Sequence, residues 1–255
     1  MKGNRVFYAE FLDFMVKSKA LLFGDFTLKS GRKSPYFINT GAYRTGADLD
    51  RLGDFYAKLI HNSVRPYESA GTVDEKLDDV ERGRVNGAIK EKFGVLFGPA
   101  YKGIPLVTTT AAKLAAGGLS LNVSFNRKER KGHGEESLIM GYQPEDGDRI
   151  AIIEDVTTAG TSVREVVSLL EELKIDAKIA ALYISVDRME RGTGDATAVT
   201  QLRQEYGIDV HSIATANDIV EYLENTPPNC TPVENAPVHA ANIRNYMEEY
   251  GGYAG

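Results

Sequence analysis

Two acidic residues, Glu154 and Asp155, precede a run of small and hydroxyl-bearing residues that ends at Ser162. Small side chains let the backbone of residues 156–162 curl, so that several N–H groups and hydroxyls can point at one spot, as phosphate binding requires. The carboxylates would repel a bare phosphate, so they are better suited to binding vicinal sugar hydroxyls, directly or with a divalent metal nearby. The run therefore indicates a ligand that carries both phosphate and ribose. The structural alternative is that acids at a strand end cap the next helix.

The elements on either side place this run at the edge of a sheet. Residues 150–153 are continuously apolar with three β-branched members, which predicts a strand buried on both faces of a parallel sheet. After Thr161 apolar residues recur every three or four positions as far as Leu173, the pattern of an amphipathic helix. Strand, loop and helix in this order predict an α/β fold, with the loop at the carboxyl end of the strand, where open sheets bind ligands.

Two basic side chains stand where they could meet the same ligand. Lys102 lies in a glycine-flanked loop between a predicted strand at 93–97 and a predicted helix at 104–116. Arg188 follows a predicted strand at 178–186, and a planar guanidinium there can hold a carboxylate with two hydrogen bonds.

The composition favours a globular protein of one domain. The chain has 255 residues, enough for a core without staples, and its lone Cys230 gives no disulfide framework or zinc site. Neither a signal peptide nor an apolar span of membrane length is recognisable, so the sequence predicts a soluble, cytoplasmic protein without a membrane partner. The net charge of −6 argues against a nucleic-acid partner, whereas positive charge gathered at residues 29–33 and 127–131 indicates a small anionic ligand.

Residues 63–92 are highly charged and are predicted to be an insertion. A capping-box pattern at residues 72–75, with Val73, Leu77 and Val80 on one helical face, predicts a short surface helix within it. The other predicted elements are a helix at 4–19, short antiparallel strands within 23–39, a helix near 49–60 started by Asp48, strands at 121–125 and 210–214, and helices at 196–206, 217–223 and 238–250.

Four stretches carry a resemblance to a known family. Residues 154–162 resemble the signature of the type I phosphoribosyltransferases, two acids followed by a threonine-rich loop that binds phosphoribosyl diphosphate (PRPP). Residues 28–37, 97–105 and 126–135 are similar to the hood, the diphosphate loop and the catalytic lid of the orotate phosphoribosyltransferase family. The resemblance covers most of the chain. It implies one domain over 1–255, with a central, mostly parallel sheet flanked by helices and a small hood formed by about 1–40.

The resemblance also implies a reaction and a set of roles. The family transfers the phosphoribosyl group of PRPP to N1 of orotate, giving orotidine 5′-monophosphate and pyrophosphate in UMP biosynthesis. Mg²⁺ is expected to bind mainly through PRPP, and a homodimer is expected to share its lid loop between subunits. The residues assigned to PRPP are Lys29, Tyr101, Lys102, Arg127, Lys128, Lys131, His133, Glu154, Asp155, Val156, Thr157, Thr158, Ala159, Gly160, Thr161 and Ser162. Orotate is assigned to Phe37, Ile38, Thr158 and Arg188, and catalysis to Lys102, Lys131, His133 and Asp155.

Other interpretations remain at this point. On composition alone, the charged segments near Lys29 and Arg127 are typical of solvated turns. A purine phosphoribosyltransferase would share residues 154–161 but is not expected to combine Lys29, the lid and Arg188. Regulators of the same fold that sense PRPP tend to lack lid residues and to add a basic DNA-binding segment. Most relatives have Asp where this chain has Glu154, which leaves the fine ribose geometry open.

Overall fold

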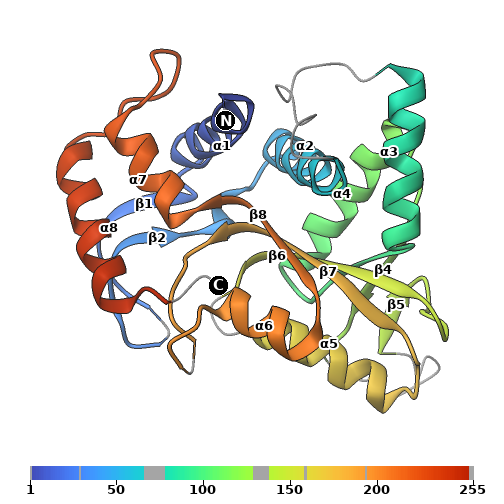
Figure 1. Cartoon of the computed structure of the whole chain (residues 1–255). Coiled ribbons are helices and arrows are strands. Elements are labelled where there is room, and N and C mark those ends of the chain that lie inside the picture. Colours follow the sequence, from blue (N-terminus) through green and yellow to red (C-terminus); the bar gives the residue numbers. More distant parts are fainter. Residues whose placement is uncertain are drawn as a thin grey trace.

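The computed structural model describes residues 2–28, 30–65, 78–128, 138–157, 160–192 and 194–252 (Figure 1). Its centre is a six-stranded sheet with strand order β5-β4-β3-β6-β7-β8, parallel except for the edge strand β5. This confirms the expected mostly parallel sheet. The three-residue β5 was not predicted, because so short a segment carries no periodic signal. The strands are β3 Val95–Gly98, β4 Asn122–Asn126, β5 Ile139–Gly141, β6 Arg149–Thr157, β7 Lys178–Asp187 and β8 Asp209–Thr215.

Helices cover both faces of the sheet (Figure 1). Strand β6 shows the two sides, because its successive side chains point to opposite faces. Ala151 and Ile153 join the core beneath the helices α1, α2 and α4, whereas Ile150 and Ile152 join the core above α5 and α6. The helices are α1 Lys2–Lys17, α2 Gly46–Ser63, α4 Gly103–Ala116, α5 Thr161–Glu172 and α6 Ala198–Tyr206. The continuous apolar run in β6 is thus explained by burial on both faces.

A two-stranded antiparallel hairpin, β1 Leu21–Thr27 and β2 Lys33–Ile38, lies beside the main sheet and confirms the predicted short strands. Both ends of the chain support it. Ala20 and Leu21 follow α1 into the core, and helix α8, Ala236–Tyr250, packs against β2 (Figure 1). Helix α7, Ala216–Glu224, packs in turn against α8. Tyr36 of β2 meets Tyr246 of α8 edge-on, with ring centroids 6.3 Å apart.

One local prediction is corrected, and another lies outside the described residues. Helix α2 starts after Thr45, whose hydroxyl accepts the Asp48 N–H at 3.1 Å, while the Asp48 carboxylate accepts the Thr45 N–H at 3.0 Å. Asp48 is therefore the fourth residue of a capping box and not the helix start. Helix α3, Asp79–Lys92, begins beyond the predicted capping box, which lies outside the described residues. Val80, one of the three residues expected to share a helical face, lies in the first turn of α3 and is 75% exposed.

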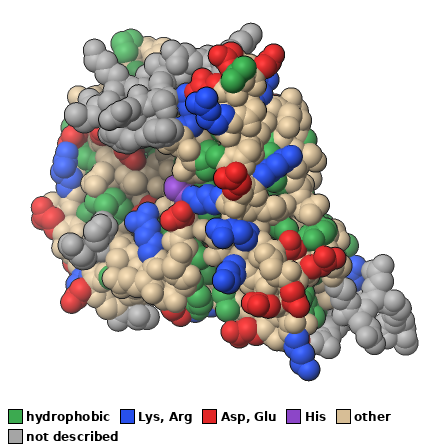
Figure 2. Space-filling view, turned by 45° about the vertical axis from the view of Figure 1, so that its right-hand side comes forward, with side chains coloured by type: hydrophobic (Ala, Val, Ile, Leu, Met, Phe, Trp, Pro, Cys, Tyr) green, Lys and Arg blue, Asp and Glu red, His purple; other side chains and the backbone are tan. Residues whose placement is uncertain are grey.

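Helix α3 instead packs through Val85 and Ile89, which are buried in the core that also holds α2. On the face of the molecule seen in Figure 2, basic and acidic side chains are interspersed. The same mixture joins neighbouring helices: Arg65 and Glu81 form an ion pair at 3.0 Å, and Lys113 and Asp50 form one at 2.8 Å. No helix in the described part of the chain combines the length and the apolar character needed to cross a membrane.

The burial of α3 leads to a stability prediction. Ile89→Ala is expected to lower the free energy of unfolding by about 2 to 5 kcal/mol, because Ile89 is fully buried and its loss leaves a cavity. Val80→Ala on the same helix is the control and should change it by less than about 0.5 kcal/mol. Urea unfolding followed by circular dichroism measures both. Equal effects at the two positions would mean that α3 does not pack through Ile89.

Candidate active site

The candidate site lies where the strand order reverses. From β3 the chain runs through α4 to β4 on one side, whereas β6 pairs with β3 on the other and leads on to β7 and β8. The carboxyl ends of β3 and β6 are therefore adjacent, and the chain leaves them toward opposite edges of the sheet. Open α/β sheets bind ligands at such a point. Residues 99–102 follow β3, and residues 158–160 connect β6 to α5. The structure thus brings together the two loops that the sequence selected.

Strand β6 is longer than predicted. It runs to Thr157, and Glu154 pairs with Ile184 of β7 while Thr157 pairs with Asp187. The two acids therefore lie within the strand and not in the loop after it, which corrects the sequence prediction. Because they are consecutive strand residues, their side chains leave opposite faces of the sheet. Glu154 faces α5, where the Ser162 hydroxyl donates a hydrogen bond to its carboxylate, and Asp155 faces α2 and α4.

Asp155 is the centre of a polar cluster. Its Oδ2 accepts a hydrogen bond from Lys102 Nζ at 2.9 Å and another from the Thr40 hydroxyl at 2.7 Å, and the residue is only 8% exposed. The side chain of Lys102, by contrast, is 67% exposed, so its ammonium group remains accessible to an anion. Two donors fix the carboxylate before any ligand arrives. Thr40 was missed by the sequence analysis, since it lies in an ordinary turn far from β6.

Glu154 occupies a different environment. Burial raises the pKa of its carboxyl to about 7; the Ser162 hydroxyl lowers it, and the negative charges of Asp155 and Glu165 raise it further. Its backbone carbonyl accepts the Tyr56 hydroxyl at 2.5 Å, which ties this part of β6 to α2. Glu154 therefore changes its charge near neutral pH, unlike an ordinary glutamate.

This shift predicts how stability depends on pH. Between pH 4.5 and 7 the unfolded chain releases the Glu154 proton and the folded chain retains it, so the folded state loses stability as pH rises through this window. Relative to Glu154→Gln, the free energy of unfolding of the unaltered protein should fall by on the order of 1 to 3 kcal/mol from pH 5 to pH 8. Glu171→Gln, an exposed position near the end of α5 whose charge is not among the causes of the Glu154 shift, is the control and should remove none of this slope. Chemical denaturation at several pH values tests it, and a constant difference between the protein and Glu154→Gln would contradict it.

The loop after β3 is held tightly at its start. A Cβ at Gly98 would lie 2.3 Å from the Gly103 carbonyl oxygen, so only glycine permits this approach of strand and helix. The Ala100 N–H donates to the Asn126 side chain at 2.7 Å, which joins the loop to β4. Asn126 is a second residue that the sequence analysis left without a role. The Ala100–Tyr101 peptide is cis. Beyond it Tyr101 is exposed, and the Lys128 ammonium lies 5.5 Å from its ring centroid.

The loop after β6 leads into the N-terminus of α5. Gly160 precedes the helix with φ of 67°, and a Cβ there would lie 2.6 Å from the Leu202 side chain. Its N–H donates to the Thr157 hydroxyl at 3.1 Å, while Val156 still pairs with β7. Thr161 and Ser162 form the first turn of α5, where free N–H groups and the helix dipole favour a phosphate.

Part of the predicted site cannot be placed. Lys29, Lys131, His133, Thr158 and Ala159 lie outside the described residues. On the hood, Phe37 is partly exposed and stacks on Phe26 at 5.5 Å, while Ile38 is half-buried. At the start of the predicted lid, the Arg127 N–H bonds to the Leu138 carbonyl at 2.8 Å.

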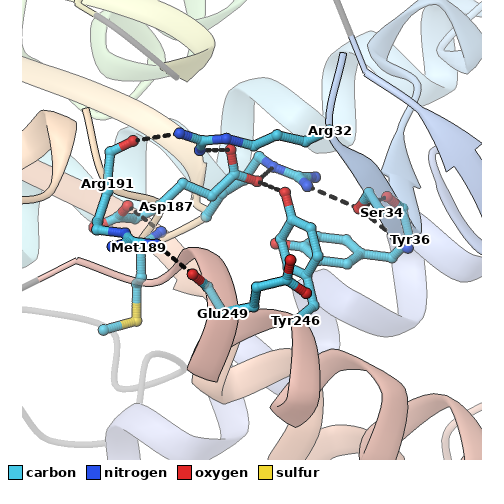
Figure 3. Close-up of polar contacts among 10 residues, drawn as sticks. Arg32, Ser34, Tyr36, Asp187, Met189, Arg191, Tyr246 and Glu249 are labelled. Carbon is cyan, nitrogen blue, oxygen red and sulfur yellow. Dashed lines mark hydrogen bonds and ion pairs between the residues drawn. The ribbon is translucent and has the colours of Figure 1, made fainter. Parts of the chain in front are cut away.

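Arg188 follows β7 on the same side of the sheet and is only 4% exposed. Its Nε donates to Glu190 at 2.6 Å, its Nη2 donates to the Ser34 hydroxyl at 3.0 Å, and its guanidinium carbon lies 4.1 Å from the centroid of the Tyr36 ring. Figure 3 shows Ser34 and Tyr36 of the hood turned toward this cluster. Arg188 thus connects the hood to the sheet. Its three partners were not foreseen from the sequence.

Comparison with known proteins agrees with this geometry. Residues 72–215 match the model of the phosphoribosyl transferase domain family. Orotate phosphoribosyltransferase of Clostridium beijerinckii is 40% identical over 97% of this chain and 99% of its own, and that of Clostridium acetobutylicum is 43% identical over 95% and 96%. The crystal structure of orotate phosphoribosyltransferase from Francisella tularensis superposes with a TM-score of 0.71 at 33% identity, covering 95% of this chain and all of the other. The chain belongs to the orotate phosphoribosyltransferases, a branch of the phosphoribosyl transferase domain family.

Proposed function

We propose that this protein transfers the phosphoribosyl group of PRPP to N1 of orotate and releases pyrophosphate. The observation that carries the proposal is the Asp155 cluster at the point where the strand order reverses. A buried carboxylate there is paired with the exposed ammonium of Lys102, which precedes α4, and the neighbouring Glu154 contacts the N-terminus of α5. Such a site suits a ligand with a sugar between two phosphate groups. Arg188, immediately after the next strand, β7, supplies a guanidinium for the acceptor's carboxylate.

The charges follow the course of the reaction. The bond between C1 of the ribose and the diphosphate oxygen breaks, a bond from orotate N1 to C1 forms with inversion, and the N1 proton is lost. While the old bond loosens, the ribose carbon becomes positive and the leaving oxygens become negative. Asp155, held in place by Thr40 and Lys102, stabilises the positive carbon. Lys102, with Lys29 and Lys131, stabilises the leaving diphosphate, and His133 can protonate it.

The described residues fit a magnesium ion that is held mainly by the substrate. The carboxylates of Glu154 and Asp155, at the end of β6, offer oxygen donors of the kind that this ion takes. Mg²⁺ prefers oxygen ligands and keeps few of them from the protein when phosphates supply the rest. We assign the protein contacts of this ion to Asp155 and Glu154, which would reach it through PRPP or through water. When bound, the ion neutralises charge that develops on the diphosphate.

We further propose that the protein is a homodimer and that residues 127–135 of each subunit complete the PRPP site of the other. The length and polarity of this segment, as read from the sequence, support the proposal. Sedimentation analysis at assay concentrations should give twice the chain mass of 27.9 kDa. A monomer that is fully active would contradict it.

One assay tests the proposed function. The protein is incubated with PRPP and Mg²⁺ and, in turn, with orotate, uracil or hypoxanthine, and pyrophosphate release is measured. Rapid release with orotate alone is expected, because only orotate carries the carboxylate that Arg188 can bind. Preference for hypoxanthine would instead favour a purine phosphoribosyltransferase, and would overturn the assignment of Arg188.

A further inference from the structure

Glu190 gathers three donors from three separate parts of the chain. Its Oε1 accepts Arg188 Nε at 2.6 Å and the Tyr246 hydroxyl at 2.8 Å, and its Oε2 accepts Arg32 Nη1 at 3.3 Å. Arg32 comes from the turn between β1 and β2, and Tyr246 comes from helix α8 (Figure 3). Glu190 itself is only 5% exposed. The carboxylate therefore ties the hood, the sheet edge and the C-terminal helix to one guanidinium.

The end of the chain reinforces this arrangement. The Gly252 N–H donates to the Met189 carbonyl at 3.0 Å, and the Arg191 N–H donates to the Tyr250 carbonyl at 2.9 Å, so residues 189–191 are held by backbone bonds on both sides of Glu190. Because α8 and the following residues are fixed to this segment, the position of Tyr246 relative to Arg188 is fixed as well. Because its members are held by several hydrogen bonds, this network fixes the orientation of the Arg188 side chain.

The two guanidiniums of the network pair directly with one carboxylate. Arg188 and Arg32 share one carboxylate, that of Glu190, and the nearby Asp187 carboxylate accepts the Met189 N–H at 2.8 Å. Buried cations are stable only with matching anions. The bonds to Glu190 and Ser34 use Nε and Nη2 of Arg188, which leaves its Nη1 to another acceptor. A ligand carboxylate could accept a hydrogen bond from Nη1, as a charge-assisted contact.

We propose that Glu190 and Tyr246 are positioning residues for the acceptor substrate: they orient Arg188 toward the carboxylate of the pyrimidine, so that α8 contributes to acceptor selectivity. This inference rests on the proposed function. It assigns a role in substrate choice to a helix that carries none of the residues selected from the sequence. Loss of either positioning group should weaken orotate recognition and leave PRPP recognition intact, because the Asp155 cluster lies on β6 and shares no hydrogen bond with this network.

The test compares Tyr246→Phe, Glu190→Gln and a matched control, Tyr250→Phe. Tyr250 lies on the same helix with its ring 5.0 Å from that of Tyr246, and the same loss of a hydroxyl there leaves the Glu190 bonds untouched. Steady-state kinetics with orotate and with PRPP, at saturating concentration of the other substrate, give the two KM values. Tyr246→Phe should raise the KM for orotate by about 3- to 10-fold and Glu190→Gln by about 10-fold or more, as for lost hydrogen bonds to a charged group. The KM for PRPP should stay within about twofold, and Tyr250→Phe should match the unaltered protein in both.

The outcomes separate this inference from the proposed function. If the unaltered protein does not use orotate, the proposed function fails. If it does, and both variants keep its KM for orotate, the positioning role is overturned. Lower thermal stability in Tyr246→Phe with an unchanged KM for orotate also overturns it, because the hydroxyl then serves only the fold. Should Glu190→Gln fail to fold, Tyr246→Phe still decides the matter, since it removes one hydroxyl and retains the ring.

Discussion

Asp155→Asn is expected to lower kcat by about 100- to 1000-fold while the Kd for PRPP changes by less than about threefold. The substitution keeps the shape of the side chain, and the amide oxygen can still accept from Lys102 and Thr40. What disappears is a negative charge beside the ribose, which matters most when C1 becomes positive in the transition state. Single-turnover kinetics give the rate of the chemical step, and isothermal titration gives the affinity for PRPP.

Asp209→Asn is the matched control for this experiment. Asp209 forms a similar pair with Lys92, at 2.8 Å, but at the amino end of β8, on the opposite side of the sheet from the site. It should leave kcat and PRPP affinity unchanged. If Asp155→Asn weakened PRPP binding as strongly as it lowered kcat, Asp155 would contribute to ground-state binding and the transition-state role would be wrong.

Arg188→Ala is expected to raise the KM for orotate by about 10- to 100-fold, the loss typical of a charge-assisted hydrogen bond to a carboxylate. The KM for PRPP should stay within about twofold. The fold should suffer as well, because removing one member of the buried pair leaves Glu190 with Arg32 and Tyr246 only. Breaking a buried pair costs about 3 to 5 kcal/mol, and the two remaining donors of Glu190 place this case at the lower end.

Arg149→Ala is the control for the loss of an arginine away from the site. Arg149 starts β6 at the far end of the sheet, where its Nε donates to the Lys92 carbonyl at 2.6 Å. It should leave both KM values unchanged. An Arg188→Ala protein that is folded by circular dichroism and binds orotate as tightly as the unaltered chain would exclude Arg188 from the acceptor site.

Much of the fold could be predicted because its signals are local. The ends of the strand predicted at 178–186 and of the helix predicted at 104–116 each lie within one residue of those in the structure. This is because burial gives each kind of element a characteristic spacing of apolar residues within a short stretch of chain. The end of β6 was misplaced for the same reason. Glu154 and Asp155 look like loop residues when strands are identified by apolar character, yet they pair with β7 along the backbone, and backbone pairing does not depend on side-chain polarity.

The sequence by itself determined the family, the mostly parallel sheet and the order of strand, loop and helix on either side of Lys102 and of Gly160, because these depend on patterns and motifs within a few tens of residues. Only the tertiary structure decided which polar groups meet. Thr40 reaches Asp155 across 115 positions, and Tyr246 reaches Glu190 across 56. A buried polar atom takes whichever donor the packed chain brings within about 3 Å. Since no local pattern records that distance, the partners of Asp155 and Arg188 became visible only in the folded protein.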